Sequence, residues 1–162
     1  MGKWINDDGL LVRFGTDKAE VAAGGSYASN AGHLVTDMIV EFGDVGASAS
    51  PLDYNLSFGK DSRIEKIEII VETAFAGAGF ALDVGLQRKD YATELDYDGL
   101  LAAIALTSLD AAGETTEITV GSTGAGALVG TTLANAGVVT VNHTGTAPTA
   151  GKAIVRVYSR TV

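Results

Sequence analysis

The chain of 162 residues contains no cysteine and only two prolines. Without cysteine there is no disulfide framework, no thiolate metal site and no cysteine nucleophile. No segment approaches the roughly 18 uninterrupted apolar residues of a membrane helix, and the chain turns acidic at Asp7 and Asp8 before a signal-peptide core could form. We therefore expect a soluble protein that is made in the cytoplasm and is stabilised by packing or assembly.

Positive charge is scarce, because 11 Lys and Arg residues face 20 Asp and Glu residues, for a formal net charge of -9. Phosphate contacts need a basic face, so this composition argues against nucleic-acid binding. Acidic residues end at Glu117, whereas Lys152, Arg156 and Arg160 follow it, so residues 118–162 carry +3 and the rest carry 8 minus 20, or -12. This asymmetry predicts that the C-terminal strands face an acidic partner.

Hydrophobic residues make up 46% of the chain and charged residues 19%, as in ordered globular proteins. The length suits one domain with a proper core. The 21 glycines indicate many tight turns and little helix, since glycine is a poor helix former and readily adopts positive φ. These properties predict an all-β protein.

The clearest pattern lies in residues 63–88, where two runs of period-two alternation flank a small-residue turn. In the first run Ile67, Ile69, Val71 and Phe75 share one face, and in residues 80–87 every second side chain is large and apolar. We predict that the two runs form a hairpin at the centre of an antiparallel β-sandwich.

The remaining segments complete a jelly-roll-like sandwich of about eight strands. Residues 1–32, with a thin Gly/Ala/Ser stretch, are expected to be an extended N-terminal arm, and residues 33–162 the sandwich domain. An acidic start followed by Ala and Leu at helical spacing predicts one short helix over about 95–109. Further strands are expected over residues 34–42, 52–59, 114–120, 137–143 and 153–160.

The search for catalytic, cofactor-binding or metal-binding residues finds none that we would assign. His33 and His143 lack partners at metal-ligand spacing and are interpreted as structural or surface residues. Asp96 and Asp98 resemble the start of a calcium loop, but the remaining ligands are missing, so helix capping is preferred. A pair of carboxylates for glycoside cleavage stays open, because separation in space is unreadable from sequence. We expect no enzyme and no cofactor.

The last strand carries the one surface feature that suggests binding. If Ala153, Val155 and Val157 face the core, the alternate residues form an outward stripe of basic, aliphatic and aromatic side chains, as interfaces prefer. An edge strand guarded by positive charges would look similar. The stripe consists of Lys152, Ile154, Arg156, Tyr158 and Arg160.

Several stretches together resemble the capsid decoration, or cement, proteins of tailed bacteriophages. They are the opening Trp4–Gly9, the Gly/Ala/Ser stretch after it, Leu82–Leu86 and the closing Thr149–Tyr158. The resemblance lies in the residue composition of these stretches and in the layout of the predicted strands, and it spans most of the chain. It implies a β-sandwich without catalytic residues that binds the outside of the assembled shell.

The resemblance further implies the major capsid protein as partner, a homo-oligomer with a trimer favoured over a dimer, and a place on the outer surface of a virion. The arm would lie along the shell or a neighbouring protomer and pair its strands there. A phage fibre tip or carbohydrate-binding module is the alternative, which exposed aromatic residues for sugar stacking would favour. Besides the stripe, the expected interface residues are Trp4, Ile5, Leu10, Val12 and Phe14.

Overall fold

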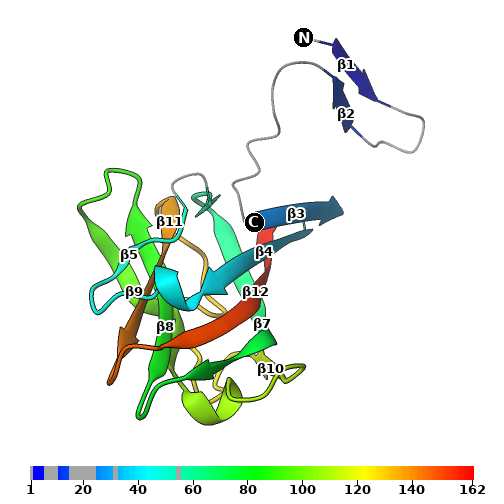
Figure 1. Ribbon diagram of the computed structural model, residues 1–162. Helices are drawn as coiled ribbons and strands as arrows, with labels where there is room; N and C mark the ends of the chain where they lie inside the picture. The colour runs from blue at the N-terminus through cyan, green and yellow to red at the C-terminus, as the bar shows by residue number, and fades with distance from the viewer. Residues whose placement is uncertain (1, 6–10, 15–24, 31–32, 54–55) are drawn as a thin grey trace.

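The computed structural model describes residues 2–5, 11–14, 25–30, 33–53 and 56–162, with side chains from residue 33 onward. Two antiparallel sheets stack as a sandwich, which confirms the predicted all-β class (Figure 1). The first sheet has the order β10-β7-β12-β4-β3, and the second has the order β5-β11-β8-β9 with β6 also paired to β11. The described residues form two single-turn 3-10 helices, and no helix among them has the length and hydrophobicity to span a membrane.

The strands of the first sheet are β3 (Gly25–Asn30), β4 (His33–Glu41), β7 (Ser62–Ala76), β10 (Thr115–Ile118) and β12 (Ala150–Thr161). Those of the second sheet are β5 (Ser50–Pro51), β6 (Ser57–Phe58), β8 (Ala81–Arg88), β9 (Glu94–Ala105) and β11 (Gly137–Thr144). A separate pair consists of β1 (Gly2–Ile5) and β2 (Leu11–Phe14). The 3-10 helices are η1 (Phe42–Asp44) and η2 (Leu106–Ser108).

One hydrophobic core lies between the two sheets, and both period-two runs contribute to it as predicted. On β7 and β8 alternate side chains are fully or almost fully buried, because each strand turns one face inward. β4, β11 and β12 add further side chains, as do β6, β9, β10 and several connections, so each sheet supplies one inner face. The buried members from the two runs are Ile67, Ile69, Val71, Phe75, Phe80, Leu82, Val84 and Leu86.

The predicted hairpin of β7 and β8 is wrong, because the two strands belong to different sheets. β7 pairs with β12 and β10, whereas β8 pairs with β11 and β9. The connection between them crosses the end of the core, where the rings of Phe75 and Phe80 stack with centroids 5.4 Å apart. The small-residue turn is therefore an arch between sheets, and the distant C-terminal strands β12 and β11 pair with β7 and β8, respectively.

The predicted helix over residues 95–109 is also wrong, since most of that segment is β9. The strand pairs with β8 through three register irregularities, and Ala103 adopts a positive φ of 50° within it. These bulges bring Leu100, Leu101 and Ile104 to buried positions at a spacing that imitates a helix. Sheet pairing outweighs the helix propensity of Ala and Leu, which is a weak preference.

Other expectations fare differently along the chain. Strands are confirmed near 34–42, 114–120, 137–143 and 153–160. In residues 52–59 only Ser57–Phe58 is a strand, and residues 54 and 55 lie outside the described part. Within the predicted arm, β1 pairs with β2, while β3 pairs with β4 and so extends the first sheet. The division of the chain at residue 32 stays a prediction.

Candidate interaction surface on the first sheet

The stripe predicted on the last strand lies at the centre of the first sheet. Ala153, Val155 and Val157 are fully buried, and their alternate neighbours face outward and are partly exposed, as predicted. β12 pairs with β4 on one side and β7 on the other, so the edge-strand explanation of its positive charges is wrong. We call the outward residues of these strands the outer face. It comprises Val35, Asp37, Ile39, Glu41, Glu65, Lys66, Glu68, Ile70, Glu72, Glu117 and the stripe Lys152, Ile154, Arg156, Tyr158 and Arg160.

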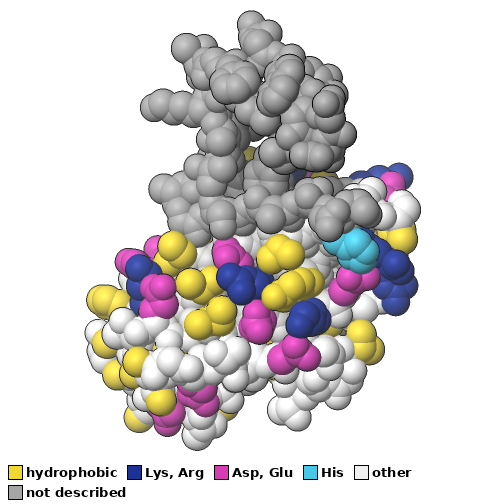
Figure 2. Space-filling view, turned by 90° about the vertical axis from the view of Figure 1, so that its right-hand side faces the viewer, with side chains coloured by type: hydrophobic (Ala, Val, Ile, Leu, Met, Phe, Trp, Pro, Cys, Tyr) yellow, Lys and Arg dark blue, Asp and Glu magenta, His cyan; other side chains and the backbone are white. Residues whose placement is uncertain are grey.

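The ladder register arranges the outer face in rows that run across the strands. Ile154 lies opposite Ile39 on β4 and Ile70 on β7, which makes a row of three isoleucines. Charged residues form the rows before and after it. Figure 2 views this side of the molecule and shows yellow apolar side chains among dark blue and magenta charged ones. The face is thus a flat, mixed surface in which an apolar row is bordered by ion pairs.

Arg156 has the best-defined charge contacts on the outer face. Its guanidinium donates two hydrogen bonds to Asp37, from Nε at 2.7 Å and from a terminal nitrogen at 2.9 Å, and lies 3.6 Å from Glu68. Such a bidentate pair has directional geometry that a single contact lacks. The bonds to Asp37 raise the pKa of Arg156 above its ordinary value. Arg156 is therefore held in place by β4 and β7 before any partner arrives.

Tyr158 and Lys66 form a second connected group. The Tyr158 hydroxyl donates to Glu68 at 3.2 Å, and the Lys66 ammonium lies 4.5 Å from the centre of the Tyr158 ring, a cation–π distance. Lys66 also donates to Glu117 on β10 at 2.6 Å, and this bond raises the pKa of Lys66. Two residues of β7, Glu68 and Lys66, therefore hold the Tyr158 side chain directly. Glu117 of β10 holds it indirectly, through its contact with Lys66.

Ion pairs also occupy the two ends of the stripe. Lys152 lies 3.3 Å from Glu72 and 3.6 Å from Glu41, and the hydrogen bond to Glu72 raises its pKa. Arg160 lies 3.1 Å from Glu65 without hydrogen-bond geometry, and the His33 ring is 3.4 Å from the same carboxylate. Every cation of the stripe therefore has a carboxylate partner within the first sheet.

This pairing changes what the charge distribution implies. Four cations on the outer face, Lys66 and the three of the stripe, contact six carboxylates from β4, β7 and β10. The chain's own acidic strands thus neutralise the cations that follow Glu117 in sequence. The expectation of an acidic partner for the C-terminal strands does not hold, because those cations are already paired.

Four of the five N-terminal residues predicted for the interface lie on the β1–β2 pair. The register sets Trp4 opposite Val12 and Gly2 opposite Phe14, and Ile5 lies opposite Leu11. Leu10 falls outside the described residues. No ladder among the described residues joins this pair to either large sheet. The structure therefore brings the five stripe residues together but does not join them to the N-terminal set by strand pairing.

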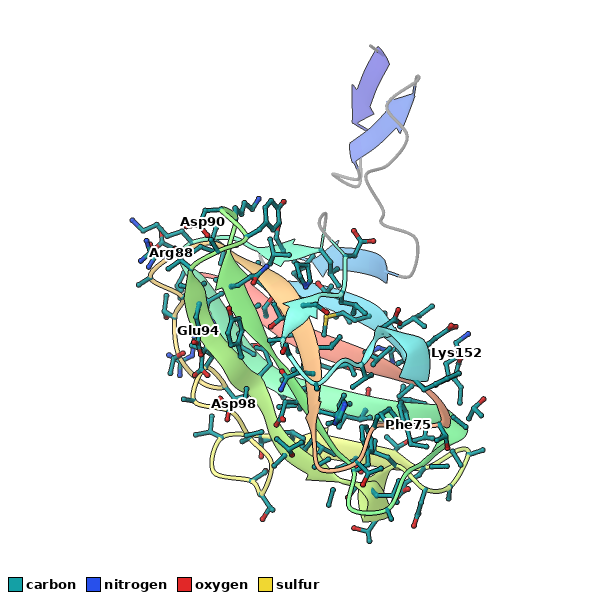
Figure 3. All side chains as sticks on the ribbon, turned by 60° about the vertical axis from the view of Figure 1, so that its left-hand side comes forward. Phe75, Arg88, Asp90, Glu94, Asp98 and Lys152 are labelled. Carbon is teal, nitrogen blue, oxygen red and sulfur yellow. The ribbon has the colours of Figure 1, made fainter. Side chains whose placement is uncertain are left out.

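A second set of ionisable residues belongs to the second sheet. Asp83 is 4% exposed, and its Oδ1 accepts a 2.7 Å hydrogen bond from the backbone N–H of Ala103; burial raises its pKa. The pKa of Asp96 is raised to about 6, first by burial and then by a hydrogen bond with Asp98. Figure 3 shows Asp98 and Lys152 on opposite sides of the sandwich, with Arg88 and Asp90 at the β8–β9 connection and Glu94 at the start of β9.

These carboxylates do not form a metal site. No group of three or more His, Asp or Glu residues in the described part of the chain has metal-holding geometry. Asp96 and Asp98 lie on β9, so their interpretation as helix caps is wrong along with the helix. His143 is a buried neighbour of Phe80, at 6.3 Å between ring centres, which agrees with a structural role. The carboxylates of Asp83 and Asp96 instead accept hydrogen bonds from backbone N–H groups of β9, those of Ala103 and Asp98, respectively.

Sequence reasoning missed the partners of the stripe. Alternation correctly placed Lys66, Glu68, Ile70 and Glu72 on the solvent side of their strand, and Asp37 and Ile39 follow the same rule on β4. What it lacked was the strand order that sets β7 and β4 on either side of β12. Strand neighbours that are distant in sequence have no local signal, so the charge ladder was invisible before the structure.

No family model matches the chain, and no curated protein matches its sequence. Solved structures with a similar fold include a chain of the acid-stable capsid of Helicobacter pylori bacteriophage KHP30, at 12% identity and a TM-score of 0.53, over 84% of this chain and 92% of that one. A chain of a phage capsid thus has a similar fold. A chain of the capsid of Ralstonia phage GP4 is 15% identical with a TM-score of 0.51, over 87% of this chain and 86% of that one. The likeness is one of architecture.

Proposed function

We propose that this protein is a structural component of a phage virion that decorates and stabilises the capsid without enzymatic activity. The observation that carries the proposal is the fold, which matches chains of two phage capsid structures over most of their length. The sequence resemblance to capsid decoration proteins points the same way. The major capsid protein is the proposed partner, the outer surface of the shell the proposed location, and a homo-oligomer, preferably a trimer, the proposed form.

The outer face of the first sheet supplies the surface that this function needs. Its isoleucine row offers apolar area, and the ion pairs on both sides hold Arg156 and Tyr158 in fixed positions. A preformed surface loses little conformational entropy on binding, which favours affinity. Repetition of the same contact over an icosahedral shell makes individually weak contacts strong in sum.

Binding to capsids that lack the protein tests this function. Purified protein is mixed with undecorated heads, and the bound amount at saturation is measured by sedimentation and quantitative gel analysis. We expect saturation at a fixed ratio to major capsid subunits, because the shell offers a defined set of equivalent sites. Unsaturable or absent binding would overturn the proposal.

A matched pair of variants tests the outer face. Ile154→Thr keeps a β-branched strand residue but removes the centre of the isoleucine row, and we expect at least about tenfold weaker binding to heads, as for a central interface residue. Val120→Thr also replaces an apolar β-branched side chain with threonine, at a site that is 67% exposed and lies outside the stripe, and we expect unchanged binding. Equal affinity of both variants would assign the contact to another surface.

A further inference from the structure

The free edges of the two sheets are protected to different degrees. Along β9 the segment after residue 123 covers the edge with backbone hydrogen bonds, from Ala102 N to Gly124 O at 2.9 Å and from Leu128 N to Gly99 O at 2.8 Å. The opposite edge of the second sheet is closed by β5 and β6, which have two residues each and include Pro51. In the first sheet β10 is a short edge that carries a charged residue, Glu117. Short, covered or charged edges resist unwanted strand pairing.

β3 forms the remaining edge and has none of these protections. All six of its residues, Gly25–Asn30, pair in continuous register with β4. Its sequence, Gly-Ser-Tyr-Ala-Ser-Asn, contains no charged residue and no proline. Within the described residues no strand pairs with its other side. A regular, uncharged edge of this length is a template for one more strand.

The register of β3 shows which backbone groups are open on that edge. Asn30 lies opposite His33 across a connection of two residues, which makes this pair a hydrogen-bonded one. In an antiparallel ladder hydrogen-bonded and non-bonded pairs alternate. The backbone N–H and C=O groups of Gly25, Tyr27 and Ser29 therefore point away from β4, toward an incoming strand.

The N-terminal hairpin, by which we mean the paired strands β1 and β2, also lacks a further strand partner among the described residues. Its two strands of four residues pair only with each other among the described residues. An isolated two-stranded hairpin is marginally stable at best in water and gains stability from further strands. Among the described residues, the hairpin thus pairs with neither large sheet, and β3 has no strand on the side that faces away from β4.

We propose that the N-terminal hairpin of one copy of this chain adds to the open edge of β3 in a second copy. Within the described residues of one chain the two elements are unpaired, and the ten residues from 15 to 24 can span up to about 33–36 Å. Each copy then supplies one hairpin and one edge. Such a head-to-tail contact builds a cyclic oligomer where the rotation between neighbouring copies closes. This inference does not depend on capsid binding.

Two variants separate the two halves of the contact. Deletion of residues 1–24 removes the hairpin and leaves β3 intact, whereas Tyr27→Pro with Ser29→Pro removes two outward N–H donors and keeps the hairpin. Proline is tolerated at an edge where its nitrogen faces outward, so the ladder to β4 is retained. Should the proline variant fail to melt cooperatively, Ser29→Lys takes its place, because an edge charge blocks pairing without altering the backbone.

The measurement is sedimentation velocity of each protein alone and of an equimolar mixture. We expect the full chain to be oligomeric, each variant alone to be monomeric, and the mixture to form a one-to-one heterodimer through the single intact hairpin and the single intact edge. A monomeric full chain would overturn the proposal. So would self-association of the deletion variant, which indicates pairing between two β3 edges, or a mixture that stays monomeric, which shows that an intact hairpin and an intact edge do not pair between two chains.

Discussion

The outer surfaces of the two sheets are built in opposite ways. On β12, at the centre of the first sheet, side chains alternate between the core and a partly exposed face, and that face is held by ion pairs. On the second sheet β8 is buried on both sides, with Asp83 and Gln87 only 4% and 3% exposed. The cause is β9, whose bulged backbone lies against Gly85. One surface is therefore available for contacts with other molecules, whereas the other is an extension of the protein's own packing.

The largest effect is expected where β9 packs on β8. A Cβ at Gly85 would lie 2.1 Å from the backbone oxygen of Asp96 and 2.2 Å from the carbonyl carbon of Tyr97. Because these are backbone atoms, β8 or β9 would have to shift to make room. Gly85→Ala should lower the free energy of unfolding by about 3 kcal/mol or more, as for an overpacked core. Urea denaturation measures it. Gly43→Ala, where a Cβ would meet nothing within 4 Å, is the control and should change stability little.

The next effect concerns the buried carboxylate of the second sheet. Asp83→Ala leaves the N–H of Ala103, at a strained positive φ, without its acceptor, so we expect a loss of about 1–3 kcal/mol. Asp83→Asn keeps an acceptor oxygen and removes a charge whose burial is unfavourable, so its loss should be smaller. Chemical denaturation at neutral pH distinguishes them. Equal losses would mean that the charge itself, not the hydrogen bond, stabilises this site.

A smaller effect is expected for the best ion pair of the first sheet. Arg156→Met retains apolar area and strand packing but leaves Asp37 and Glu68 without their cation. Because these side chains are 32%, 24% and 22% exposed, water compensates in part, and the loss should be about 1 kcal/mol. Lys152→Met is the matched variant. Lys152 is more exposed and makes one longer contact to each of two carboxylates, so its replacement should lower the free energy of unfolding by less. The reverse order would contradict our view of the outer face.

The smallest effect is a pH dependence from Asp96. Its pKa in the folded protein is raised to about 6 from an ordinary value near 3.8, so the folded state binds the proton more tightly than the unfolded state does. This group therefore favours folding most below about pH 4, and its contribution falls as pH rises through about 6. We expect no more than about 1 kcal/mol, because Asp96 is partly open to water.

Melting temperatures of the protein and of Asp96→Asn from pH 4 to 7 measure this contribution as a difference between the two curves. The difference should grow across that range and level off above it.

Asp90 gives a comparison of opposite sign, because hydrogen bonds from Thr93 and from the backbone lower its pKa to about 2. Its contribution is present above about pH 4 and is lost as pH falls through about 2. A curve for Asp96→Asn parallel to the unchanged protein would refute the assignment.

Local pattern succeeded where a strand alternates and failed where a bulge interrupts it. The core-facing sides of β7, β8 and β12 follow from period two alone, although the other side of β8 is covered as well. The same reasoning misassigned β9, since bulges bring Leu100 and Leu101 inward together and give a helix-like spacing. It also joined β7 to β8, because a short turn between alternating runs is typical of a hairpin and equally of an arch between sheets.

The sequence by itself determined the all-β class, the inner face of most strands and the composition of the stripe on β12, because these depend on residue type and on spacing within one segment. Only the tertiary structure decided that β12 is central, that carboxylates of β4 and β7 neutralise its cations, and that β3 is left with an open edge. The physical reason is that strand order is set by the burial of two whole sheets against each other. That free energy is shared among segments far apart in the chain, so no single stretch of sequence records it.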